Sequence, residues 1–484
     1  MTQGIEGASR ALGVLCGIAI LAIAARAAAI VLRPAIRDRD RRFAIAMAAL
    51  AALAIVKLAL LPVFPGYVVD MRYVSLWTWV IARLGPAHIY DPIYQCKYAP
   101  AYLYALWPAG SLAAAISPGK PGAVLRILSE YPPILTDLVF SAAVYAAIRR
   151  IAPPHLALAG ALLAALNPAL IYTSLVWGQN DSVLAAAILL STLLVADSRY
   201  AIGWAMAALG VLIKAQGLIL LPVLAWWMLL ESRPRDWIAP AAAALGMAAL
   251  VTAPFQIGRS WLLLPNLYTE SLGWFPRATA NAFNLMFLLG GLHSYDSAKV
   301  FGISYFALGN LLFPATYLVA GCVIWRNRSL RALLYAVFLV YLGMFVFETR
   351  IHERYLYYAV ALIAPLVFDS WIALALLGTL TATLLFNLVL VKFVLEHHVF
   401  FAANDPAATA AAAINLAAFA IAALWGLAIA APSGSRFQRL PTVLKRLLAP
   451  PGFATASNRA VAAVAGTMKP HGKRKGRRQS RGHR

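Results

Sequence analysis

The sequence predicts an all-α polytopic membrane protein, and three features of composition and patterning support this prediction. Hydrophobic residues make up 62% of the 484 residues and charged residues only 12%, about half the charged fraction of a soluble domain. Several apolar runs approach or exceed the roughly 20 residues that cross a bilayer as a helix. The remaining charge gathers in short islands at the borders of these runs, where charge beside hydrocarbon is costly and usually functional.

The beginning of the chain sets the orientation that we expect. Residues 11–32 form the first apolar run, and an arginine-rich block over 33–42 follows. Basic loops mark the cytoplasmic side of a membrane, so we place the N-terminus outside and expect the helix over 43–64 to return to the outer face. A long outer segment, residues 65–130, would then carry an aromatic amphipathic helix lying in the interface.

Residues 99–116 are apolar enough to span the membrane, but we interpret them as re-entrant or interfacial. A span there would turn every later basic loop outward, against the positive-inside rule. From residue 131 the expected helices are 132–149, 156–175, 181–196, 200–213, 217–230, 237–254, 302–325, 332–347, 355–370, 372–391 and 407–431. Together with the two leading helices they give about 13 spans, within a range of about 11 to 14, with the N-terminus out and the C-terminus in.

The basic tail sets a boundary to the membrane domain. Residues 433–484 hold 13 Lys and Arg and no Asp or Glu, so we divide the chain into a membrane domain, 1–432, and a disordered cytoplasmic tail. A basic run can bind nucleic acid or anionic lipid, but on a membrane protein it more often marks the cytoplasmic side. We therefore expect membrane lipids and no nucleic acid as partners. The three cysteines suggest neither a disulfide framework nor a metal site.

The densest polar island is FETRIHERYLYY, residues 347–358. His352 and Arg354 offer cationic hydrogen-bond donors suited to a lipid-linked phosphate at the outer interface. Glu348 and Glu353 would orient these two side chains. The alternative is a polar turn between two membrane helices, with its charges solvated at the surface.

Two acidic residues near the outer face are candidates for chemistry. Asp70 follows a membrane helix, where a carboxylate near apolar walls can act as a general base, although it could also cap a helix N-terminus. Asp137 lies about one turn into a membrane helix and needs a partner there. Arg126, Lys214 and Arg354 are the partners that we consider, and a purely structural pair is the alternative.

The segment WGQND, residues 177–181, opens a helix with amide and carboxylate groups beside a tryptophan. Such a cluster suits sugar hydroxyls, while Asp181 alone would also fit the dipole of a helix N-terminus. Farther along the chain, Lys214 and Gln216 interrupt two short apolar runs. Lys214 could contact a phosphate as a point charge or extend to the interface to keep its ammonium group in water.

These islands, in this order, resemble the GT-C superfamily of membrane glycosyltransferases. The nearest resemblance is to the bacterial family related to the second mannosyltransferase of GPI-anchor synthesis, and more distantly to the glucosyltransferases that use dolichyl-phosphate-glucose. The resemblance spans roughly residues 43–370. It is carried by Asp70 before an aromatic helix, Tyr98-Ala99-Pro100 with Tyr102, Tyr131-Pro132-Pro133 with Asp137, Trp177-Gly178-Gln179-Asn180-Asp181, Lys214-Ala215-Gln216 with Pro222, and His352-Glu353-Arg354-Tyr355.

The resemblance implies a sugar transferase that uses a polyprenyl-phosphate sugar. It assigns the catalytic aspartate of the first long outer loop to Asp70 and the histidine that meets the donor phosphate to His352. The chain departs from the pattern at Ala99, where relatives often carry a second proline. An acceptor that is a glycan or a lipid-linked molecule is expected. The Ala- and Arg-rich composition, typical of bacteria, suggests an inner membrane with the site facing the periplasm.

We therefore expect a hexosyltransferase that transfers mannose or glucose with inversion and without a metal or other cofactor. Asp70 is the expected base. The donor phosphate is assigned to His352, Arg354 and Lys214, and sugar or other substrate groups to Gln179, Asp181, Asp137, Tyr98 and Gln216. The alternative from another class is a transporter or flippase of lipid-linked sugars, which shares the many helices and membrane-border charges. A non-catalytic scaffold is a third interpretation.

Overall fold

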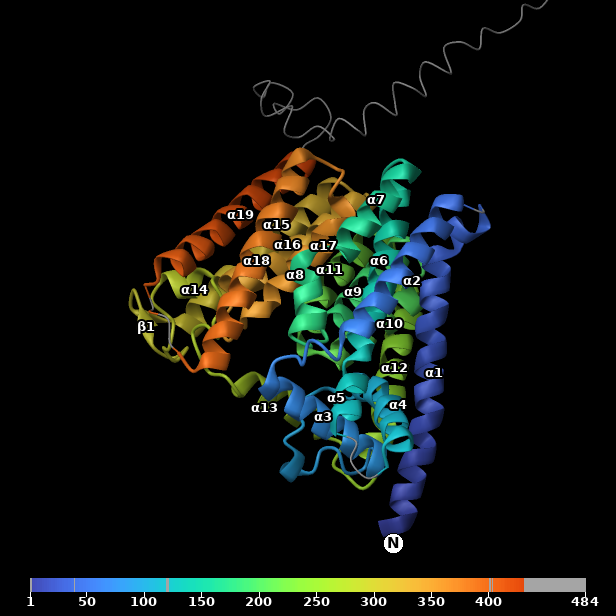
Figure 1. The fold of residues 1–484 in the computed structure, drawn as a ribbon. Coiled ribbons are helices and arrows are strands. Elements are labelled where there is room, and N and C mark those ends of the chain that lie inside the picture. The colour runs from blue at the N-terminus through green and yellow to red at the C-terminus, as the bar shows by residue number, and fades with distance from the viewer. Residues whose placement is uncertain (1, 39, 119–121, 400–401, 403, 431–484) are drawn as a thin grey trace, which may run out of the picture.

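The computed structural model describes residues 2–38, 40–118, 122–399, 402 and 404–430. The predicted basic tail over 433–484 lies outside these residues. Within them the chain forms a bundle of helices with one small β-hairpin (Figure 1). This supports the predicted all-α polytopic class.

The helices vary widely in length. In the first half they are α1 Thr2–Arg37, α2 Arg41–Leu60, α3 Val68–Arg83, α4 Pro100–Ile116, α5 Gly122–Ser129, α6 Tyr131–Ile151, α7 Pro154–Ala165, α8 Pro168–Ile171, α9 Asp181–Ala196 and α10 Tyr200–Ile213. In the second half they are α11 Leu220–Glu231, α12 Ile238–Gln256, α13 Leu263–Gly273, α14 Leu285–Leu288, α15 Tyr305–Arg326, α16 Leu330–Phe347, α17 Tyr357–Ile363, α18 Trp371–His397 and α19 Pro406–Ala430.

Shorter elements connect these helices. The strands β1 Lys299–Val300 and β2 Ile303–Ser304 pair antiparallel just before α15. The 3₁₀ turns are Pro92–Tyr94, Ala215–Ile219, Pro234–Trp237, Glu353–Leu356 and Ala364–Leu366, and Tyr172–Val176 forms a π-helical turn.

The predicted count of about 13 spans is not confirmed. Among the described residues, eight helices are long and apolar enough to cross a membrane, or nine if the bent pair over 154–176 is one span. The segments expected over 181–196, 200–213, 217–230 and 355–370 are short or broken. The 16-residue α9, for example, is only about 24 Å long at 1.5 Å per residue, short of a hydrocarbon core of about 30 Å.

The N-terminus of α1 and the end of α19 lie at opposite ends of the bundle, as the predicted topology requires. The N-terminus of α1 lies at the same end as α3, α4 and α5 (lower end of Figure 1), whereas α19 ends at the opposite end. The turn between α1 and α2 lies at that opposite end too. The outer segment and the N-terminus thus share one end, and the direction of the bundle in a membrane stays a prediction.

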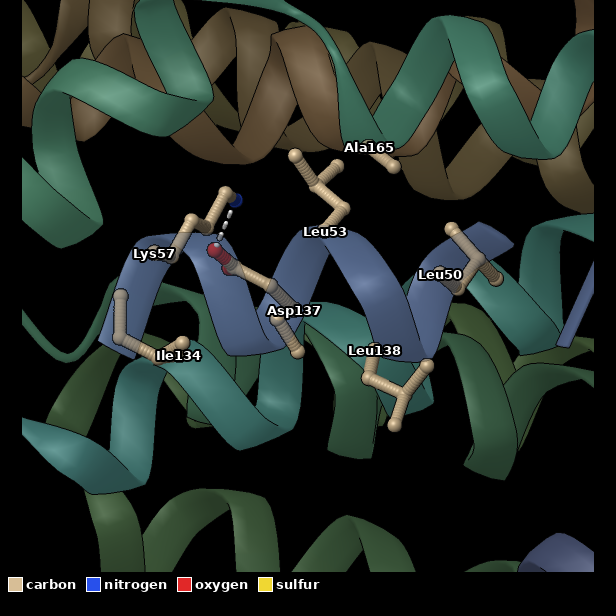
Figure 2. Close-up of a pocket in the computed structure, with 8 residues that line it drawn as sticks. Leu50, Leu53, Lys57, Ile134, Asp137, Leu138 and Ala165 are labelled. Atoms are coloured by element: carbon tan, nitrogen blue, oxygen red, sulfur yellow. Dashed lines mark hydrogen bonds and ion pairs between the residues drawn. The ribbon is translucent and has the colours of Figure 1, made fainter. Parts of the chain in front are cut away.

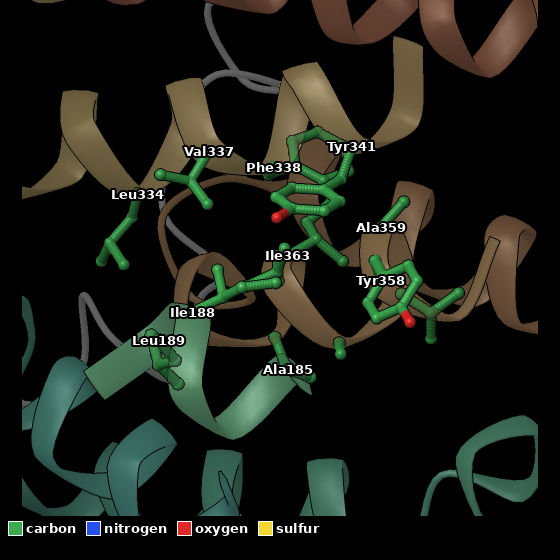
Figure 3. Close-up of a cluster of buried hydrophobic side chains, with 14 of the residues drawn as sticks. Ala185, Ile188, Leu189, Leu334, Val337, Phe338, Tyr341, Tyr358, Ala359 and Ile363 are labelled. Atoms are coloured by element: carbon green, nitrogen blue, oxygen red, sulfur yellow. The ribbon is translucent and has the colours of Figure 1, made fainter. Parts of the chain in front are cut away.

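The core lies where α9, α16 and α17 meet. Tyr341 of α16, Tyr358 of α17 and Ile188 of α9 are buried in one cluster (Figure 3). Because lipid tails are as apolar as these side chains, close packing rather than exclusion of water stabilises helix contacts in a membrane. The core therefore holds the start of α9 and the segment before α17 in fixed positions, and both carry candidate site residues.

The aromatic helix predicted in the outer segment is α3, Val68–Arg83. Trp77 and Val80 are buried, as expected for one face of an amphipathic helix, but Tyr73 and Leu76 are 38% and 36% exposed. The helix packs against α4, which follows it in the outer segment. Whether α3 lies in the interface stays a prediction.

The single helix predicted over 156–175 is broken, with a bend of 43° between α7 and the segment 168–176. Pro168 lacks the N–H that would continue the hydrogen-bond pattern. Asn167 restarts the chain as an N-cap, because its side chain accepts from the backbone N–H groups of Ala169 and Leu170. The π-helical turn follows directly and leads into WGQND.

Candidate functional site

Asp70 is the first component of the candidate site. It lies in the first turn of α3, half-buried, and the N-cap of that helix is Tyr67, so the capping alternative is wrong. Its Oδ2 atom accepts a hydrogen bond from Trp177 Nε1 at 3.0 Å and from Gln179 Nε2 at 2.6 Å. Two segments that are remote in sequence therefore meet at one carboxylate oxygen.

Close approach of two backbones brings these segments together. The N–H of Tyr67 donates to the carbonyl oxygen of Trp177 at 2.9 Å. Gly178 has a φ of +82°, and a Cβ atom there would lie 2.6 Å from the sulfur of Met71. Glycine is the residue that tolerates both this conformation and this contact. The glycine of WGQND therefore allows its neighbours to reach Asp70.

Asp181 is the second component, at the first position of α9 and fully buried. Its Oδ1 atom accepts from Lys214 Nζ at 2.7 Å and from the Tyr358 hydroxyl at 2.5 Å. The Lys214 side chain is only 10% exposed. Lys214 therefore turns inward to a buried carboxylate, and the alternative in which it extends to the interface is wrong.

The third component is the segment from His352 to Arg354, which forms a bridge with Ala280 and Asn281. Glu353 lies between its neighbours as predicted, with Oε1 at 2.9 Å from Arg354 Nη1 and Oε2 at 3.8 Å from His352 Nδ1. Burial opposes ionisation of Glu353, but His352 and Arg354 together lower the pKa of its carboxyl group. Glu353 is therefore an anionic support for two cationic donors.

Arg354 joins the three components electrostatically. Burial alone would lower the pKa of its guanidinium group, but the charges of Glu353, Asp70 and Asp181 raise that pKa well above its ordinary value. Arg354 therefore stays positively charged and interacts electrostatically with both candidate carboxylates.

Tyr98 and Gln216 complete the group. The Tyr98 hydroxyl lies 3.5 Å from the side-chain oxygen of Asn180, and the Gln216 side chain lies next to Tyr355. We use the name outer cluster for the residues thus brought together: Asp70, Tyr98, Gln179, Asn180, Asp181, Lys214, Gln216, His352, Glu353, Arg354, Tyr355 and Tyr358.

Within the part of the chain that the structure describes, four buried polar atoms of the outer cluster have no hydrogen-bond partner: Gln179 Oε1, Asn180 Nδ2, Asp181 Oδ2 and Arg354 Nε. A buried polar group without a partner costs about 1–3 kcal/mol. Two of these atoms accept hydrogen bonds and one is a cationic donor, beside the half-buried Asp70. Such a set can bind an uncharged polyol together with an anion, which is the chemistry of a sugar phosphate.

Asp137 lies apart from the outer cluster, and its predicted partners are wrong. Its Oδ2 atom is 2.8 Å from Lys57 Nζ and accepts from the Ser174 hydroxyl at 2.8 Å. Arg126 is directed to Glu130 instead, and Lys214 to Asp181. Figure 2 shows the Lys57–Asp137 pair at a small pocket lined mainly by apolar side chains of α2 and α6.

Sequence reasoning missed several residues of this arrangement. Lys57 could have been identified from the sequence, because a single cation in the apolar run over 43–64 is costly in a membrane and needs a partner. Asn180 was considered only as part of the WGQND cluster, and Tyr358, which closes the FETRIHERYLYY island, was assigned no role. Only the folded chain shows that Tyr358 contacts Asp181.

The site is thus a polar, charged cluster at the outer-segment end of a bundle of membrane-type helices. Residues 111–261 match the family model described as dolichyl-phosphate-mannose-protein mannosyltransferase. The match includes Gln179, Asp181 and Lys214, and it ends before His352. No curated protein matches the chain. The family match supports the predicted resemblance to membrane glycosyltransferases of the GT-C type, and the particular relation to the GPI-anchor mannosyltransferase family is not confirmed.

Proposed function

We propose that the protein is a GT-C-type hexosyltransferase that takes mannose or glucose from a polyprenyl-phosphate sugar. The acceptor would be a glycan or a lipid-linked molecule on the periplasmic face of a bacterial inner membrane. The observation that carries this proposal is the outer cluster, in which four buried polar atoms without a hydrogen-bond partner accompany the carboxylate that Gln179 contacts, Asp70. The match to a mannosyltransferase family model favours mannose as the sugar.

Asp70 would act as the general base. Both of its hydrogen-bond donors engage Oδ2, so Oδ1 is the atom that would take the proton from the acceptor hydroxyl. The acceptor oxygen forms a bond to the anomeric carbon as the bond between that carbon and the phosphate oxygen breaks. The electron pair leaves with the polyprenyl phosphate, and a single displacement inverts the anomeric centre.

The leaving phosphate would be held by Arg354 and His352, with Lys214 beside them. Arg354 Nε is buried without a partner, and charge-assisted hydrogen bonds to phosphate are stronger than neutral ones. Lys214 keeps further N–H donors after its bond to Asp181. Fixed cations can stabilise the charge that develops on a leaving group, so this chemistry requires no metal ion.

The sugar would lie against the start of α9. Gln179 Oε1 and Asp181 Oδ2 can accept from sugar hydroxyls, and Asn180 Nδ2 can donate to one. Tyr98 and Gln216 would border the same space. We do not include Asp137 among the substrate contacts, because its carboxylate is occupied by Lys57 and Ser174.

A transporter or flippase of lipid-linked sugars is the second candidate, and the broken helix over 154–176 is the observation that favours it. Transporters place broken helices at their substrate sites. Here the break leads instead to the Trp177 and Gln179 contacts with Asp70, which favours an enzyme. Uptake of a sugar or lipid-linked sugar into proteoliposomes without transfer would reverse this ranking.

The proposal is tested by a transfer assay on the purified protein with radiolabelled polyprenyl-phosphate mannose and glucose and crude glycan and lipid acceptors. General-base help contributes about 10²- to 10⁴-fold in rate, so Asp70→Asn should lower turnover by about that factor and leave donor binding intact. The matched control is Asp91→Asn, because Asp91 lies in the same outer segment and pairs with Arg259. Near-normal turnover of Asp70→Asn would contradict the assignment of the base.

A further inference from the structure

The buried pair of Lys57 and Asp137 connects the two chain segments that meet at Asp70. Lys57 lies in α2, which leads into Tyr67 and then α3, and Ser174 lies in the π-helical turn directly before Trp177. Both side chains donate to the same oxygen, Asp137 Oδ2, at 2.8 Å. One carboxylate oxygen of Asp137 in α6 therefore links two chain segments. One segment leads to Asp70, and the other leads to its hydrogen-bond donors Trp177 and Gln179.

This link is costly to maintain inside a membrane. The Lys57 and Asp137 side chains are 5% and 11% exposed. A buried ion pair is often no more stabilising than well-packed apolar residues of the same size, so stability alone does not explain its presence. The single proton of the Ser174 hydroxyl has two acceptors within reach, the carbonyl oxygen of Leu170 at 3.2 Å and Asp137 Oδ2 at 2.8 Å, and the contact with Asp137 is the shorter.

The π-helical turn is the element that the link acts on. In this turn the N–H of Trp177 donates to the carbonyl of Tyr172, a wider ring than in an α-helix. Single π-helical turns are rare and frequently occur at functional sites. The turn sets the backbone positions of Trp177 and Gln179, which follow it in the chain. The side chains of both residues donate to Asp70 Oδ2.

We propose that Lys57, Asp137 and Ser174 form a positioning network that holds the π-helical turn so that Trp177 and Gln179 orient Asp70. None of the three contacts Asp70 itself, so they act through the turn and are not catalytic residues. Whether the oriented carboxylate serves as a base rests on the proposed function. The orientation itself is a property of the fold and can be measured without it.

The test compares Ser174→Ala with Thr173→Val. Both remove one hydroxyl group from the same buried turn, but the Thr173 hydroxyl donates to the backbone carbonyl of Ala169 and, among the described residues, to no side chain. Ser174→Ala should move the resonance of the Trp177 indole N–H in a ¹⁵N-labelled sample, and Trp177→Phe identifies that resonance among those of the 13 tryptophans. Thr173→Val should leave the resonance in place.

Turnover provides the second measurement. A misplacement of about 1 Å can cost about 10²-fold in rate, and we expect Ser174→Ala to lower kcat by about 10-fold with the donor KM nearly unchanged. If the Ser174 hydroxyl were merely structural, its removal would not lower kcat relative to the donor KM. If the protein transfers no sugar, the proposed function fails, but the indole resonance still decides the positioning role.

A double variant, Lys57→Met with Asp137→Leu, removes the network without leaving a charge unpaired. It should fold, because apolar replacement of a buried pair is often neutral, and it should move the Trp177 resonance as Ser174→Ala does. The proposal is overturned if Ser174→Ala matches Thr173→Val in both resonance and kcat, or if the folded double variant keeps the wild-type resonance.

Discussion

The two ends of the bundle differ in how completely their charged groups are hydrogen-bonded. At the end near the turn between α1 and α2, Asp40 Oδ2 accepts from the Tyr145 hydroxyl and Arg149 Nε, and Oδ1 accepts from the N–H of Arg42. At the other end, Asp181 and Arg354 of the outer cluster each leave a buried atom without a partner. A fully paired network stabilises a fold, whereas each unpaired buried group needs a particular explanation. On the proposed function, the charges at the first end join helices and those of the outer cluster bind substrate.

The largest expected contrast between the two ends is in donor affinity. Arg354→Lys keeps the positive charge but removes the planar donor set that includes Nε. A hydrogen bond to a charged group contributes about 1.5–3 kcal/mol, so the Kd for polyprenyl phosphate should rise by about 10- to 100-fold.

The matched control for this substitution is Arg149→Lys at the opposite end, where Arg149 pairs with Asp38 and Asp40. It should lower the thermal midpoint and leave the Kd unchanged. The measurement is a titration of each detergent-solubilised variant with polyprenyl phosphate. If Arg354→Lys and Arg149→Lys changed the Kd equally, the proposed distinction between the two ends of the bundle would be wrong.

A second contrast concerns the pH dependence of stability. Because the pKa of the Glu353 carboxyl is lowered in the folded protein, its stabilising effect is complete above the ordinary value of about 4.3 and is lost as pH falls through the lowered value. Glu353→Gln should therefore cost about 3 kcal/mol near neutral pH, since it leaves Arg354 short of a buried partner. The difference from the wild type should shrink in acid.

Thermal midpoints measured from neutral to acidic pH check this expectation. The control is Glu396→Gln, because Glu396 is 32% exposed and pairs with Lys392 one helical turn away. Exposed pairs contribute at most about 1 kcal/mol, so this variant should differ little from the wild type at every pH. A Glu353→Gln difference that grows in acid would show that the carboxyl is not ionised in the folded state.

The sequence was informative wherever an apolar run ended at a charge. The helices predicted over 181–196 and 200–213 coincide with α9 and α10, because such borders determine where a membrane-type helix can end. The break near Pro168 was missed although Asn167-Pro168 is a turn signal, because the apolar character of the chain continues on both sides of it. The number of spans stays a prediction for a related reason, because hydropathy does not reveal which short helices cross completely.

Within the site, residue types could be predicted better than their partners. Asp70, Asp181 and Arg354 were singled out as charges at apolar borders, and the structure brings them together. The contact of Gln179 with Asp70 depends on the close approach of Gly178 to the outer segment, which has no local signature. The pairing of Asp137 with Lys57 likewise depends on how α2 packs against α6.

The measurement that tests the central claim most directly is an electron cryomicroscopy structure of Asp70→Asn in lipid nanodiscs with polyprenyl-phosphate mannose. The substitution should prevent turnover and leave the donor site complete. We expect the phosphate at Arg354 Nε and His352, and sugar hydroxyls at Gln179 Oε1 and Asp181 Oδ2. Donor density elsewhere, with these four groups still without contacts to it, would contradict the claim that the outer cluster binds the donor.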